Sequence, residues 1–189
     1  TMQIAHNWNK SGDNYMTPSF RDATNITSIT ISQKSALSGT IGNYFMYSYA
    51  NGCSSLTSLD VPDTSGLTSV GTPFMYYYAY GCSSLTSLAI PDTSSLTSVG
   101  NFFMRSYAEG CSSLTSLAIP DTSGLTIVGD AFMRSYAQNC SSLIELVLPA
   151  VGWFEDNNVS WSVPSGRLGV LKGRVLNPSD LSGWQALTA

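Results

Sequence analysis

The chain repeats one sequence unit with a period of about 29 residues, and this repeat limits its fold more than any other feature. Each copy carries one cysteine in the same surrounding sequence, at Cys53, Cys82, Cys111 and Cys140. The glycines that open the copies are Gly42, Gly71, Gly100 and Gly129. A repeat of this length is too short to bury its own apolar face, so it stacks on its neighbours. The sequence therefore predicts one continuous core running through a stack of similar units.

Each copy contains two short apolar segments that predict strands. In the second copy Leu88 and Ile90 alternate with polar residues, as in a short parallel strand that faces a core. Pro91 ends this strand because proline has no N–H to donate to a neighbour. An Asp-Thr-Ser turn follows, and Leu96 and Val99 then predict a second short strand or extended edge.

The rest of each copy, for example residues 100–111, predicts a helix of two to three turns. Phe103, Tyr107 and Cys111 recur at helical spacing and would face the sheet. The predicted N-caps are Asn43, Thr72, Asn101 and Asp130. The predicted left-handed residues at the helix ends are Gly52, Gly81, Gly110 and Asn139.

The repeat unit resembles the BspA-like leucine-rich repeats of bacterial and protist surface proteins. In the first copy the matching positions are Cys53, Ser54, Ser55, Leu56, Leu59, Val61, Pro62, Val70 and Gly71. The match covers roughly residues 26–148. The family's repeats are usually shorter, so the extra residues here indicate a longer helix and a wider turn. The resemblance implies adhesion or recognition outside the cell, in bacteria, their phages or certain protists, and it implies no chemistry.

These patterns predict an α/β fold, a right-handed leucine-rich-repeat solenoid of about five coils. Short parallel strands would line one side and short helices the other. The pattern begins at Ile26, Ile29, Ile31 and Leu37, whose equivalents in the first full copy lie slightly more than one repeat later. Leu143, Leu146 and Leu148 complete a fifth strand. We expect an N-terminal cap at residues 1–25, the solenoid at 26–149 and a C-terminal cap at 150–189, because an uncapped stack exposes its core and edges.

Composition and charge argue against several classes of partner. The net charge is −4, and residues 42–148 hold seven acidic side chains against Arg105 and Arg134. We therefore expect no binding to nucleic acid or to anionic membranes. No apolar run approaches the length of a membrane span. A chain rich in Ser, Thr, Asn and Tyr indicates an extracellular or surface-displayed protein, on a cell or a virion.

Residues typical of catalysis or metal binding form no recognisable motif. His6 is the only histidine, and cysteines a full repeat apart lack the close pairing of zinc sites. We expect the cysteines to form a buried, reduced ladder. Asp63, Asp92 and Asp121 form a column that fits either a repeated Asx turn or a calcium site. We predict no enzymatic activity, no cofactor and no metal.

Among the positions that differ between nearly identical copies, two predict an exposed binding surface. The first holds Tyr47, Tyr76, Arg105 and Arg134, and the second holds Asn51, Tyr80, Glu109 and Gln138. We place Tyr77, Tyr76 and Tyr80 at the centre of this surface. Tyr and Arg concentrate binding energy at interfaces, and aromatic faces also stack on sugar rings. Drift at unconstrained solvent positions is the alternative interpretation.

The leading functional hypothesis is a non-catalytic extracellular recognition or adhesion module. Its partner would be a protein or glycan on a cell surface, as for a bacterial surface protein or a phage receptor-binding module. The alternative is a structural subunit of an extracellular fibre, surface layer or phage appendage, which self-associates through the solenoid.

Overall fold

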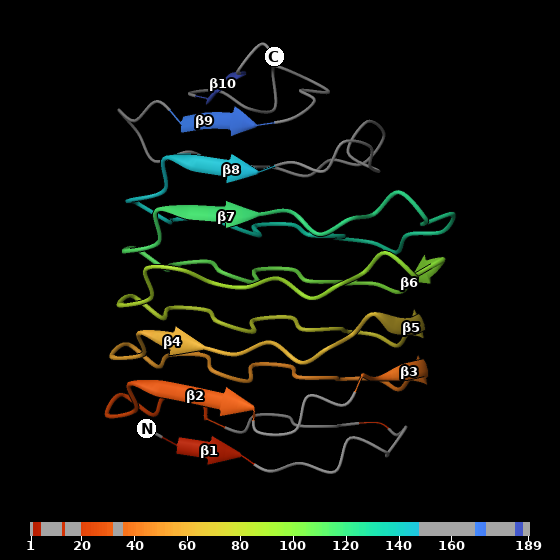
Figure 1. Cartoon of the computed structure of the whole chain (residues 1–189), viewed down its shortest axis with the longest axis horizontal. Coiled ribbons are helices and arrows are strands. Elements are labelled where there is room, and N and C mark those ends of the chain that lie inside the picture. The colour runs from red at the N-terminus through yellow and green to blue at the C-terminus, as the bar shows by residue number, and fades with distance from the viewer. Residues whose placement is uncertain are drawn as a thin grey trace.

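The chain forms a stack of rungs that are paired in parallel, as the computed structural model shows (Figure 1). The structure describes residues 2–4, 13, 20–31, 36–147, 169–172 and 184–186. The strands are β1 (Met2–Ile4), β2 (Ser28–Ile31), β3 (Ser38–Ile41), β4 (Ser58–Leu59), β5 (Gly66–Val70), β6 (Ser98–Val99), β7 (Ser116–Ala118), β8 (Glu145–Val147), β9 (Gly169–Lys172) and β10 (Trp184–Ala186). We number the rungs by their residues: rung 1 is 42–70, rung 2 is 71–99, rung 3 is 100–128 and rung 4 is 129–147.

All strand pairs in the described residues are parallel, and they form three small sheets. Their orders are β1-β2-β4, β3-β5-β6 and β10-β9-β8-β7. Leu117 of β7 lies opposite Leu146 of β8, which is the same position one repeat later. Ile29 of β2 lies opposite Leu59 of β4, so the slightly longer offset predicted at the start of the stack is confirmed. The repeat therefore fixes the register between rungs.

The core consists of columns in which each rung contributes the same side chain. One column stacks Phe45, Phe74, Phe103 and Phe132, with ring centroids 5.3, 5.4 and 5.5 Å apart. A second column stacks Tyr49, Tyr78, Tyr107 and Tyr136, with centroids 5.5, 5.1 and 5.3 Å apart. These rings are buried, and near-parallel stacking at this spacing is a favourable aromatic arrangement. The repeat thus produces a continuous core, as predicted.

The segments predicted as helices are turns instead, so the predicted α/β leucine-rich-repeat solenoid with helices on one side is wrong. The described residues contain no helix, and only short parallel strands in small sheets. A helix would require each N–H to bond to a carbonyl four residues earlier. Here the N–H of Ser106 donates to the carbonyl of Arg134 at 2.8 Å, and the N–H of Ala108 donates to that of Tyr136 at 2.9 Å. Both acceptors lie in the next rung.

Every second residue of these segments has a left-handed backbone conformation, which explains why no helix forms. Phe102, Met104 and Ser106 have φ values of 60°, 46° and 53°. The left-handed conformation costs roughly 1–2 kcal/mol for a non-glycine residue. Hydrogen bonds between rungs offset this cost, since Met104 donates its N–H to Phe74 of the rung before and Ser106 donates to the rung after. The backbone groups are thereby satisfied along the stack.

The polar residues predicted as helix caps serve the stack in a different way. The Oδ1 of Asn101 accepts the backbone N–H of Asp130, one rung later, at 2.8 Å. It therefore caps the neighbouring rung and not a helix of its own. Gly110 and Asn139 do adopt the predicted left-handed conformation, with φ values of 78° and 61°. Each of these residues ends the turn segment of its rung, directly before the cysteine of that rung.

Two predicted strands are missing and the terminal regions are only partly described. Residues 87–90 of rung 2 are not a strand, although the equivalent residues of rung 3 form β7. The second predicted strand of rung 2 is present as β6, whereas that of rung 3 is reduced to an isolated bridge between Ser98 and Ile127. The predicted caps at 1–25 and 150–189, with His6, lie largely outside the described residues, and their boundaries stay predictions. In the described part no helix has the length and apolar character needed to cross a membrane.

Candidate ligand-binding surface

Six aromatic side chains gather on the turn segments of rungs 1 to 3, and we call them the aromatic surface. They are Tyr44, Tyr47, Tyr76, Tyr77, Tyr80 and Phe102. Hydrogen bonds between rungs position them, because the N–H of Tyr77 donates to the carbonyl of Arg105 at 3.1 Å. The N–H of Ser48 donates in the same way to the carbonyl of Tyr76 at 2.8 Å. Equivalent residues of successive rungs therefore lie next to one another.

The rings of this surface contact one another across rungs as well as within rung 2. Tyr76 and Tyr77 stack with their centroids 3.9 Å apart. Tyr76 also stacks on Phe102 of the next rung at 5.8 Å, and its edge meets Tyr47 of the previous rung at 5.5 Å. Tyr80 meets Tyr77 edge-on at 5.1 Å. These contacts make one connected aromatic row along the stack.

The most exposed rings lie at the margins of the aromatic surface. Tyr44 is 45% exposed and Tyr80 is 37% exposed, while the other four are half-buried. Tyr77 occupies a position where rungs 1 and 3 hold the buried serines Ser48 and Ser106. Its φ of 57° matches theirs, so a single change of residue type adds a ring to the surface without changing the backbone.

The guanidinium of Arg105 lies over the aromatic surface. Its Cζ is 5.4 Å from the ring centroid of Tyr76 and 5.6 Å from that of Phe102. Cation–π contacts of this kind contribute roughly 0.5–1 kcal/mol at exposed sites. Burial, followed by a hydrogen bond with Tyr77, raises the pKa of Tyr76 to about 12, and the charge of Arg105 opposes this shift. The phenol therefore stays neutral at physiological pH.

Five of the nine residues predicted for the site come together here. They are Tyr47, Tyr76, Tyr77, Tyr80 and Arg105. The other four lie on the equivalent turn segments of rungs 1, 3 and 4, and in the described structure no ring contact or ion pair joins them to the aromatic surface; they are Asn51, Glu109, Arg134 and Gln138. Tyr80 meets Tyr77, three residues earlier in the chain.

Sequence reasoning missed Tyr44 and Phe102. Their position holds Pro73 in rung 2 and Ala131 in rung 4, so it too varies between copies. That variation is the signal that identifies the position. The position directly follows the predicted N-cap and lies inside the predicted helix.

The aspartate column forms repeated Asx turns. The Oδ1 of Asp63 accepts the N–H of Ser65 at 3.1 Å and its hydroxyl at 2.7 Å, and these bonds lower the pKa of Asp63. Asp92 makes the same two bonds to Ser94. Among the described residues no group of three or more His, Cys, Asp or Glu side chains is placed to hold a metal. The geometry matches the turn interpretation of this column.

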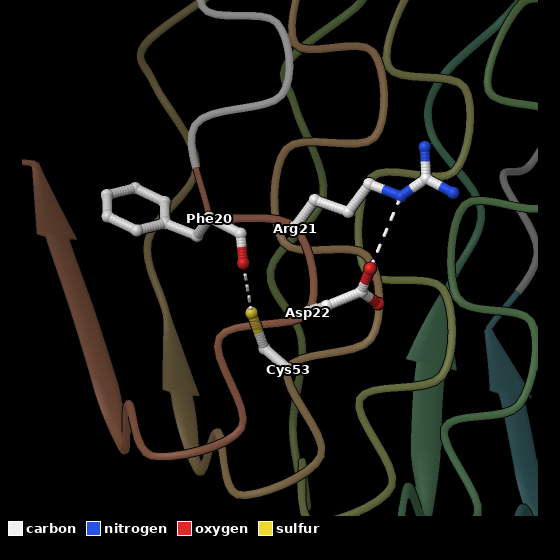
Figure 2. Close-up of polar contacts among 4 residues, drawn as sticks. All are labelled: Phe20, Arg21, Asp22 and Cys53. Atoms are coloured by element: carbon white, nitrogen blue, oxygen red, sulfur yellow. Dashed lines mark hydrogen bonds and ion pairs between the residues drawn. The ribbon is translucent and has the colours of Figure 1, made fainter.

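The four cysteines are all free and buried. The Sγ of Cys53 donates to the carbonyl of Phe20 at 2.9 Å, beside an ion pair of Arg21 with Asp22 at 3.6 Å, as Figure 2 shows. Cys82 donates in the same way to the carbonyl of Ala50. Burial raises the pKa of Cys82 to about 12. The ladder is therefore packed as neutral thiols, which are poor nucleophiles.

Comparison of the chain with models of protein families, with curated proteins and with solved structures finds no match.

Proposed function

We propose that the protein is a non-catalytic extracellular recognition module that binds a glycan through the aromatic surface. The observation that carries the proposal is the connected row of partly exposed tyrosine rings on rungs 1 and 2, which continues to Phe102 on rung 3. Rigid rings of this kind provide contact area at a low cost in conformational entropy. The resemblance of the repeats to those of BspA-like surface proteins supports a role in adhesion outside the cell.

The composition of the surface favours a glycan over a protein as ligand. A stable protein interface buries roughly 800 Å² on each partner, around a core that is largely apolar. The exposed large hydrophobic side chains of the described residues are Tyr44, Tyr80, Ile127 and Ile144. Only the two tyrosines belong to the aromatic surface, and each offers both an apolar ring and a hydroxyl. A sugar ring presents the same combination, with apolar C–H groups on its faces and hydroxyls at its edge.

The test replaces two tyrosines by residues that the chain itself uses at the same positions. Tyr77→Ser with Tyr80→Gln gives rung 2 the residues found at Ser135 and Gln138 of rung 4, so the fold should be retained. We expect this double variant to lose at least about tenfold in affinity for oligosaccharides on a printed array of neutral and acidic glycans, because aromatic anchors dominate binding energy. Circular dichroism and the unfolding midpoint establish that the variant is folded.

A matched control removes an exposed apolar side chain outside the aromatic surface. Ile127→Ser introduces the residue found at Ser69 and Ser98, and we expect its glycan binding to equal that of the wild type. Wild-type protein that binds no oligosaccharide on the array contradicts the proposal. Self-association of that protein in light scattering would then favour the structural subunit.

A further inference from the structure

The aromatic surface is bordered by the two arginines of the repeats. Between residues 42 and 147 the sequence contains no lysine, and Arg105 and Arg134 are its only cationic side chains. Both occupy the position that holds Tyr47 in rung 1 and Tyr76 in rung 2. One column along the stack therefore changes from aromatic to cationic between rungs 2 and 3.

The two arginines lie on adjacent rungs. The carbonyl of Arg134 accepts the N–H of Ser106, the residue after Arg105, at 2.8 Å. Neighbouring strands in a sheet are roughly 4.8 Å apart, and the buried ring columns here have similar spacings. Two like charges on adjacent rungs repel each other unless an anion lies between them or water screens them.

Neither arginine is neutralised within the described part of the chain. The ion pair found there joins Arg21 to Asp22, and it involves neither Arg105 nor Arg134. The Nε of Arg105 is buried and has no hydrogen-bond partner among the described residues. Its guanidinium is held in place by Tyr76 and Phe102, and Arg134 is exposed. Arginine held on an aromatic face is well suited to paired hydrogen bonds with a carboxylate or sulfate.

We infer that Arg105 and Arg134 form an anion-binding end of the aromatic surface and that the ligand is an acidic glycan. This inference rests on the proposed function and narrows its ligand class. A glycan lying along the stack contacts the tyrosines of rungs 1 and 2 with its sugar rings. Its carboxylate or sulfate group binds the guanidinium groups of rungs 3 and 4. Because Arg105 and Arg134 are the only cationic side chains between residues 42 and 147, an acidic group on the ligand is attracted to this strip and not to the rest of the repeats.

The experiment compares matched acidic and neutral probes by isothermal titration calorimetry. The acidic probes are hyaluronan and heparin oligosaccharides, and the neutral probe is hyaluronan whose carboxylates have been reduced to alcohols. We expect the wild type to bind at least one acidic probe at least about tenfold more tightly than the neutral probe, because charge-assisted hydrogen bonds are the stronger ones. The preference should shrink as salt is added.

The readout for the arginines is the ratio of acidic to neutral affinity within each variant. Arg105→Gln with Arg134→Gln is expected to bring this ratio close to one, whereas Arg21→Gln removes a charge of the same sign near the N-terminal end and should leave it unchanged. A wild type that binds acidic and neutral probes equally, or a double variant that keeps the preference, overturns the inference while the proposed function stands. Absence of binding to every probe and to the whole array contradicts both.

Discussion

Alkali is expected to unfold the protein, with the free energy of unfolding falling steadily once the pH passes about 9. Burial raises the pKa of the Cys82 thiol from 9.0 to about 12, and that of Cys140 to the same extent. Above pH 9 the unfolded chain releases these protons while the folded chain keeps them. The stabilisation present at lower pH is therefore lost as the pH rises toward 12. Each such thiol lowers the free energy of unfolding by about 1.4 kcal/mol per pH unit in this window.

The tyrosine column strengthens this effect above about pH 10. Burial raises the pKa values of Tyr78, Tyr107 and Tyr136 well above the ordinary 10.0, so these phenols also ionise first in the unfolded chain. Urea unfolding at a series of pH values measures the slope. Cys82→Ala should flatten that slope by about 1.4 kcal/mol per unit between about pH 9 and 12. A free energy of unfolding that stays constant through this range would contradict the burial of the cysteine thiols and the tyrosine hydroxyls.

Tyr107→Ala is expected to destabilise the protein by about 3–5 kcal/mol, the range for truncating a large buried aromatic side chain. Tyr107 is 0% exposed and its ring stacks between Tyr78 and Tyr136, at 5.1 and 5.3 Å. Its hydroxyl donates to the carbonyl of Ala89 at 2.8 Å. Truncation leaves a cavity in the middle of the column and removes the donor to the carbonyl of Ala89, and the midpoint of urea unfolding measures the loss.

Two variants separate the contributions of the ring and the hydroxyl. Tyr107→Phe keeps the stacked ring and removes only the bond to Ala89, so it should cost roughly 0.5–1.5 kcal/mol. Tyr80→Gln changes an exposed tyrosine of rung 2 to the residue found at Gln138 of rung 4 and should stay within roughly 0.5 kcal/mol. Equal unfolding midpoints for Tyr107→Ala and Tyr80→Gln would show that the column does not support the fold.

The sequence predicted the pairing of the rungs but not the conformation of the turn segments. Parallel stacking follows from identical copies, and it brings Leu117 opposite Leu146. The spacing of Phe103 and Tyr107 suits a helix and also suits the turns that form. The difference depends on the sign of φ at Met104 and Ser106, residues with no strong preference for the left-handed region. Hydrogen bonds between rungs decide the conformation, and they are not visible in one copy.

The site was predicted only in part, because some of its contacts also depend on the stacking of neighbouring rungs. Positions that vary between copies identified Tyr76 and Arg105, which the structure brings within 5.4 Å. The contact of Tyr76 with Phe102 depends on the stacking of adjacent rungs. The position of Phe102 also holds a proline and an alanine, so its residues share no chemical class that would have indicated binding.

Glycan binding at the aromatic surface is tested most directly by mapping the bound glycan with nuclear magnetic resonance. The tightest-binding oligosaccharide from the array is titrated into the labelled protein, and backbone amide signals are followed. We expect the largest shifts at Tyr76, Tyr77 and Arg105, on adjoining turn segments of rungs 2 and 3. Shifts centred instead on the exposed threonine column, at Thr68, Thr97 and Thr126, would contradict binding at the aromatic surface.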